Sequence, residues 1–178
     1  REVAPALAEG PVAPKALQQT HKDSEAAARR GFATRAGELA GELNYEAYEA
    51  LSARNISGAF RALSERNAAL ARQACVERSE QTHGEFRGNL AGLQAHFPLD
   101  DQDLSKQASH FVQVAKQAFD QATAHLQEVE GCRIVRAALH KRAEKDQATL
   151  ERYNVEQWAQ LVDEPLQRSR EWLPAKGG

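Results

Sequence analysis

The chain has 178 residues, and its 23 Lys and Arg against 25 Asp and Glu give a formal net charge of −2. This balance excludes the strongly basic character typical of a protein whose main partner is nucleic acid. Hydrophobic residues make up 42% of the chain but aromatic residues only 6%, which predicts thin seams between helices rather than a thick globular core.

Proline is almost absent from the interior of the chain. Between Lys15 and Glu164 the single proline is Pro98, and proline breaks helix interiors. The residues around it are mostly strong helix formers. We therefore expect a long-helical domain over residues 15–165, with a turn at 98–101 where an aspartate caps the next helix.

No segment shows the alternation of a half-buried strand, so the predicted fold class is all-α. Folding at Pro98 gives an elongated antiparallel hairpin of long helices, or a coiled-coil-like bundle, with an additional N-terminal helix along one side. Residues 1–14, rich in proline and alanine, are expected to form an extended arm. Residues 166–178 are expected to be a C-terminal tail that frays or docks onto a partner.

Apolar residues at alternating steps of four and three mark the expected seams. The seam before the turn comprises Ile56, Phe60, Leu63, Leu70 and Ala74, and later Phe86, Leu90, Leu93 and Phe97. The seam after the turn comprises Leu104, Ala108, Phe111, Ala115, Phe119 (or Ala118), Ala122, Leu126 and Val129. A hairpin about Pro98 predicts that Phe111, Phe119, Leu126 and Val129 face Phe60, Leu63 and Leu70. Gly84, Gly88 and Gly92 share one face, interpreted as a close backbone approach or a weakened, kinked segment.

The two cysteines, Cys75 and Cys132, have no metal or redox spacing. In a hairpin about Pro98, residue 132 lies opposite residue 64, roughly 16 Å from Cys75 along the helix. A disulfide needs Cα atoms within about 7 Å. The sequence therefore predicts two reduced cysteines and no disulfide.

No catalytic, cofactor-binding or metal-ligating residues are predicted. The six histidines, His21, His83, His96, His110, His125 and His140, lack ligand spacing and are expected to be exposed. No nucleophile elbow, phosphate loop or dinucleotide fingerprint occurs. We expect a protein that is not an enzyme and has no cofactor.

The chain has no run of eighteen apolar residues, so no transmembrane segment is expected. No secretory signal is visible at its start, and the segment at 29–34 has the arginine and aromatic pattern found around mitochondrial presequence cleavage sites, although acidic residues precede it. The expected location is intracellular, with an organelle such as the mitochondrion, after N-terminal processing, as the specific alternative.

Long, proline-poor helices rich in alanine and glutamine, above all residues 103–130, resemble those of phasins, the coat proteins of polyester storage granules. That resemblance implies an amphipathic coat on a granule or lipid surface. A second resemblance is to peripheral-stalk and other scaffold subunits, whose long helices end in a short docking segment.

The narrow apolar stripe and interleaved acids favour helix–helix contact over lipid binding. The predicted function is thus a non-catalytic structural subunit of a larger protein assembly, a strut that binds other protein subunits. The alternatives are the phasin-like coat and a helical adaptor or effector module. The candidate interaction residues are Trp158, Trp172, Phe111 and Phe119.

Overall fold

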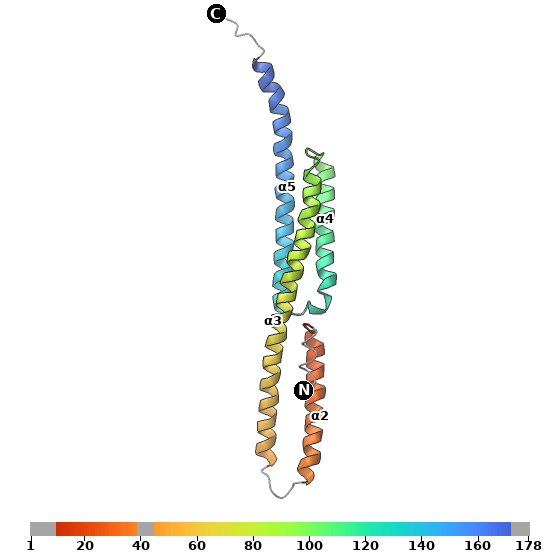
Figure 1. Ribbon diagram of the computed structural model, residues 1–178, viewed down its shortest axis with the longest axis vertical. Helices are drawn as coiled ribbons and strands as arrows, with labels where there is room; N and C mark the ends of the chain where they lie inside the picture. The colour runs from red at the N-terminus through yellow and green to blue at the C-terminus, as the bar shows by residue number, and fades with distance from the viewer. Residues whose placement is uncertain (1–9, 39–44, 172–178) are drawn as a thin grey trace, which may run out of the picture. The chain divides into compact units, whose positions relative to one another are not determined.

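A computed structural model describes residues 10–38 and 45–171, with side chains over 10–35 and 49–164. Its elements are α2 (Pro14–Glu38), α3 (Tyr45–Gln94), α4 (Asp101–Ala122), a short 3-10 helix η1 (Ala124–Leu126) and α5 (Glu130–Glu171), as Figure 1 shows. Within those ranges no strand is present, and the all-α prediction is confirmed. Most of the predicted arm, residues 1–9, lies outside the described residues.

The chain divides into two compact units. The first unit comprises residues 1–77 and 123–135, and the second comprises residues 78–122 and 136–178. Both α3 and α5 contribute to each unit, because the boundary falls within these helices.

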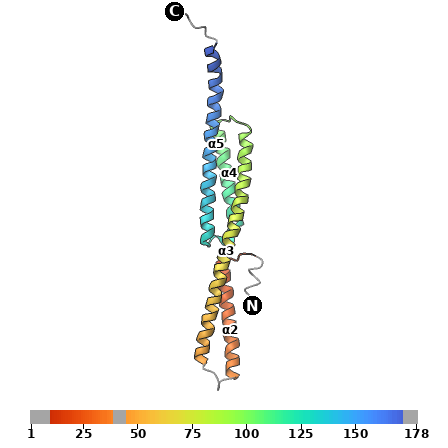
Figure 2. The same ribbon diagram turned by 60° about the vertical axis from the view of Figure 1, so that its left-hand side comes forward.

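In the first unit α2 runs antiparallel to the early part of α3, and the two lie side by side in Figures 1 and 2. His21 of α2 stacks on Phe60 of α3 with ring centroids 3.9 Å apart. Just before α2, the Val12 backbone exchanges two hydrogen bonds of 2.8 Å with the buried Asn67 side chain. The segment just before α2 therefore packs against α3 of the same chain.

The predicted absence of a disulfide is wrong. Cys75 and Cys132 are bonded, with Cα atoms 5.5 Å apart. The prediction assumed one helix pair folded at Pro98, but α4 ends at Ala122 and the chain turns again over 123–129. Leu126 is buried in this turn, and α5 begins directly after it. The second turn brings Cys132 beside Cys75 rather than beside residue 64.

Gly131, in the first turn of α5, is the glycine that close packing requires. A Cβ at this position would lie 3.0 Å from the Cβ of Arg72 on α3. By contrast, a Cβ at Gly84, Gly88 or Gly92 would meet nothing within 4 Å. The prediction of a close backbone approach at these three glycines is wrong for the described part of the chain, and α3 is helical through all of them.

In the second unit the later part of α3, α4 and most of α5 lie side by side (Figures 1 and 2). Two hydrogen bonds between α4 and α5 show the direction of these helices. Lys116 bonds Glu144 at 2.8 Å, and Ser109, earlier in α4, bonds Gln147, later in α5, at 3.0 Å. These helices are antiparallel, so α5 runs parallel to α3. The core between the three helices consists of Phe86, Leu90, Leu93, Leu104, Ala108, Val112, Ala115, Ala143 and Leu150.

This arrangement corrects the predicted pairing of seams. Phe111 packs against the core of the second unit, whereas Phe60, its expected partner, stacks on His21 in the first unit. For Phe111 the error is one of register along the helix pair. A turn near residue 98 places Phe111 opposite the region of Phe86, not opposite residues 60–70.

The break between α3 and α4 covers residues 95–100 and contains a cis peptide bond between Phe97 and Pro98. Asp100 caps α4, because its Oδ1 accepts hydrogen bonds from the backbone N–H groups of Gln102 (2.9 Å) and Asp103 (3.2 Å). The aspartate therefore satisfies donors that have no partner within the helix.

Candidate interaction surface

The structure separates the four candidate interaction residues. Phe119 is only 1% exposed and belongs to the interior of the second unit, so its ring offers no surface to a partner. Phe111 is partly buried against the core cluster. Trp158 is 44% exposed on α5, and Trp172 lies outside the described residues.

The inward face of α5 is continuous along the second unit. Leu139, Ala143, Leu150 and Asn154 are buried at helical spacing and lie on one side of the helix. Asn154 is level with the turn between α3 and α4, since its side chain bonds both the N–H of Leu99 (2.8 Å) and the C=O of Leu99 (2.9 Å). It also donates to Asp101, the first residue of α4, at 2.9 Å. Asn154 thus fastens α5 at the end of the three-helix bundle.

Past the turn between α3 and α4, α5 continues to Glu171, as Figure 1 shows. Val155 still lines a shallow hollow with Asp101, Leu104 and Ser105 of α4. Seventeen residues of helix extend about 25 Å at a rise of 1.5 Å per residue. We call this segment, residues 155–171, the α5 overhang. Its described side chains end at Glu164.

The α5 overhang carries large apolar side chains that face solvent. Val155, Trp158, Leu161 and Val162 are 56%, 44%, 52% and 58% exposed. Their spacing of three and four residues gathers them on one side of the helix. Leu161 follows Leu150 and Asn154 at steps of four and seven, so the overhang's apolar face continues the seam that is buried lower in α5.

Trp158 is fixed at the base of this face. Its indole Nε1–H donates a hydrogen bond of 2.9 Å to the C=O of Leu99, the oxygen that also accepts from Asn154. The ring is therefore held by its polar edge while much of its apolar surface stays exposed, an arrangement typical of an anchor residue.

Charged residues accompany the apolar residues of the overhang. Arg152 precedes it, and Glu156, Asp163 and Glu164 are the charged residues between 155 and 164. Among the described residues, neither Arg152 nor Asp163 has an ion-pair partner. Further along, the overhang also contains Arg168, Arg170 and Glu171, so charges of both signs lie along it.

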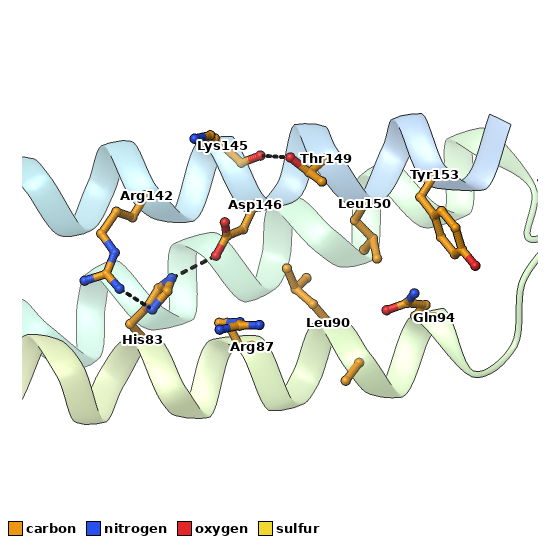
Figure 3. Close-up of a pocket in the computed structure, with 11 residues that line it drawn as sticks. His83, Arg87, Leu90, Gln94, Arg142, Lys145, Asp146, Thr149, Leu150 and Tyr153 are labelled. Carbon is orange, nitrogen blue, oxygen red and sulfur yellow. Dashed lines mark hydrogen bonds and ion pairs between the residues drawn. The ribbon is translucent and has the colours of Figure 1, made fainter. Parts of the chain in front are cut away.

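A second polar feature lies between α3 and α5, where an open groove of about 660 Å³ is lined by His83, Arg87, Arg142, Lys145, Asp146 and Tyr153 among others (Figure 3). His83 is 6% exposed, which corrects its predicted exposure. Its Nε2 lies 2.8 Å from Asp146 and its Nδ1 lies 3.2 Å from the Arg142 guanidinium, as Figure 3 shows. Arg142 also donates to Glu80 at 3.0 Å.

This network ties α3 to α5. Arg142 has no acceptor atoms, so His83 Nδ1 must accept and Nε2 must carry the proton that is donated to Asp146. Both ring nitrogens of His83 are then occupied within the protein. No group of three or more histidine, cysteine or acidic residues with metal-binding geometry occurs among the residues that the structure describes.

His140, also predicted to be exposed, is only partly exposed on α5. Burial lowers its pKa below the ordinary value of 6.5, and the positive charges of Lys116 and Arg136 lower it further. Its Nε2 has no hydrogen-bond partner in the described part of the chain. The imidazole is thus neutral in the folded protein near pH 7.

Comparison with known proteins assigns no relative: no family model, no curated protein and no solved structure matches the chain. In the described residues, none of the helices combines the length and the apolar character needed to cross a bilayer.

Proposed function

We propose that this protein is a non-catalytic structural subunit of a larger protein assembly, and that it docks through the α5 overhang. The observation that carries the proposal is that the packing face of α5 continues past the helices that cover it. Leu161 is 52% exposed there, in line with Leu150 and Asn154, which are buried lower in the same helix.

An exposed apolar face of this kind is completed by another helix. Burial of apolar surface contributes about 25 cal/mol per Å², and Trp158 offers the large, partly fixed ring that dominates many interfaces. The heptad-like spacing of Leu150, Asn154 and Leu161 suits a helix that continues the seam. The rest of the chain supplies helical length, as expected of a strut.

The coat-protein alternative is less well supported by the same surface. Helices that bind lipid surfaces carry Lys and Arg beside a broad apolar face, whereas the overhang, residues 155–171, contains four acidic and only two basic residues. An anionic lipid surface would repel this excess of acidic residues. An adaptor or effector module would use the same overhang and differs in its partner only.

The test compares two aspartate substitutions at exposed apolar residues of α5. Leu161→Asp alters the overhang, and Ile134→Asp, at a site 61% exposed in the first unit, is the matched control. Each full-length variant is expressed in its native cells, and the size of the assembly that contains it is measured on native gels. We expect Leu161→Asp to release the free chain and Ile134→Asp to leave the assembly intact.

Two results would contradict this proposal. The first is an assembly that tolerates Leu161→Asp and Trp158→Ala equally well. The second is binding of the isolated chain to vesicles of anionic phospholipid with a gain of helicity, which would favour the coat.

A further inference from the structure

The groove between α3 and α5 has bounded ends, an apolar floor and unpaired positive charges. We infer that it binds a small organic monoanion, a carboxylate on an elongated apolar body. Such a site is independent of docking at the α5 overhang and goes beyond the proposed function.

Side chains that bridge the two helices bound the groove at both ends. At one end the buried His83 of α3 bonds Asp146 of α5 at 2.8 Å. At the other end Tyr153 of α5 lies beside Phe97, just after the end of α3, with ring centroids 5.9 Å apart. Figure 3 shows the His83–Asp146 pair and Tyr153 at opposite ends of the groove. Gln94 follows His83 by eleven residues of α3, or about 16 Å, so the groove admits a small molecule, whereas a long partner helix would meet these bridges.

The floor of the groove between these ends is apolar. Leu90 of α3 and Leu150 of α5 are both buried and line it, as Figure 3 shows. Ala91 also lines the groove and adds little bulk. The volume of about 660 Å³ lies within the range of about 300 to 1,000 Å³ that is common for small-molecule sites. The floor therefore suits an aliphatic or aromatic body that covers the two leucines.

The walls of the groove carry positive charge that the protein itself does not pair. Arg87 of α3 and Lys145 of α5 line it, and neither has an ion-pair partner within the described ranges. The third cation, Arg142, bonds Glu80 at 3.0 Å. Asp146 supplies the other negative charge. Three cations against two carboxylates leave one positive charge in excess, which a single carboxylate neutralises.

A carboxylate suits these cations in geometry as well as in charge. The planar guanidinium of Arg87 can hold both oxygens of a carboxylate, and hydrogen bonds between charged groups are roughly twice as strong as those between neutral groups. A dianion would leave a negative charge unbalanced. Because the groove is open and its cations are exposed, we expect a Kd of about 0.1 to 1 mM for an acid of eight carbons, and salt should weaken the binding.

The test is a titration of the full-length chain with octanoate, followed by the amide resonances in nuclear magnetic resonance spectra. We expect saturable shifts in residues 83–94 of α3 and 142–153 of α5. Octanamide, which has the same chain without the charge, should bind at least fivefold more weakly. Acetate, which has the charge without the chain, should bind at least tenfold more weakly.

Substitutions then separate charge from shape. The Arg87→Gln/Lys145→Gln double variant should raise the Kd of octanoate on the order of tenfold and leave that of octanamide unchanged. Lys106→Gln, at an exposed site of α4 outside the groove, is the matched control and should change neither Kd. Ala91→Phe fills the groove and should raise both Kd values more than tenfold, with circular dichroism confirming that each variant keeps its helicity.

Three results would overturn the inference. The first is no saturable shift in the groove at ten times the expected Kd of octanoate. The second is equal binding of octanoate and acetate, which would show that the apolar floor contributes nothing and that the cations form only a charged surface. The third is equal binding of octanoate and octanamide, or shifts confined to the α5 overhang, either of which would show adsorption to apolar surface without recognition of the anion. None of these results bears on whether Leu161→Asp releases the chain from its assembly.

Discussion

Reduction of the Cys75–Cys132 disulfide is expected to destabilise the first unit strongly. The bond closes a loop across a sequence separation of 57 residues. In the chain-entropy model, a loop of that length restricts the unfolded chain enough to stabilise the folded state by about 4 kcal/mol. Both cysteines are almost fully buried, at 0% and 3% exposure, so the folded structure already holds them together.

The measurement is urea unfolding of the full-length chain, with and without reductant, followed by helical circular dichroism. We expect reduction to lower the free energy of unfolding by up to about 4 kcal/mol. The Cys75→Ala/Cys132→Ala double variant is the control, because its unfolding should not respond to reductant. It also separates the loss of the cross-link from other effects of the reagent.

Two results would refute this reasoning. A decrease smaller than about 1 kcal/mol would show that closure of the loop does not restrict the unfolded chain as the model requires. Alkylation of both cysteines in folded protein prepared without reductant would show that the bond does not form. The expected mass of the unreduced chain is that of the thiol form less two hydrogens.

Three further changes test the second unit. Phe119→Ala should lower the free energy of unfolding by about 3 to 5 kcal/mol, measured by urea unfolding, because it removes a ring that is 1% exposed; little change would mean that the ring is not packed. Asn154→Leu should lower the free energy of unfolding by about 1 to 3 kcal/mol, because it leaves the Leu99 N–H without its acceptor. Gln160→Leu, at an exposed site of the same helix, is the control and should leave the free energy of unfolding nearly unchanged. The pKa of His140 in the folded protein lies below 6.5, so folding opposes protonation of this imidazole. The stability that His140 contributes is therefore present above pH 6.5, and it is lost as the pH falls through the lowered pKa. His140→Gln should flatten that part of the pH profile of unfolding, and an unchanged profile would show that the imidazole titrates normally.

Local signals in the sequence account for much of the secondary structure. Helix propensity and apolar spacing predict the helices, because each depends on residues within a few turns of one another. The break near Pro98 is local as well: proline disfavours helix in the residue before it, and Asp100 supplies the cap.

The second reversal of the chain was decided by tertiary packing. Residues 123–129 contain no proline or glycine, so propensity alone allows the helix to continue through them. The turn is stabilised by contacts that are distant in sequence: Leu126 and Val129 are buried, and Cys132 bonds Cys75. Periodicity identifies which side of a helix is apolar but not which helix will cover it.

The sequence could not predict the polar network around His83 or the exposed end of α5 for the same reason: both depend on which helices lie side by side. His83 and Asp146 are 63 residues apart, and neither has a local signal that marks it as buried or paired. The uncovered length of α5 depends on where Asn154 meets Leu99, and so on the register between helices. The sequence by itself therefore determined the helices and one of their turns, because those depend on short-range energies. The three-helix arrangement, the disulfide and the exposed end of α5 depend on long-range contacts, which only the tertiary structure specifies.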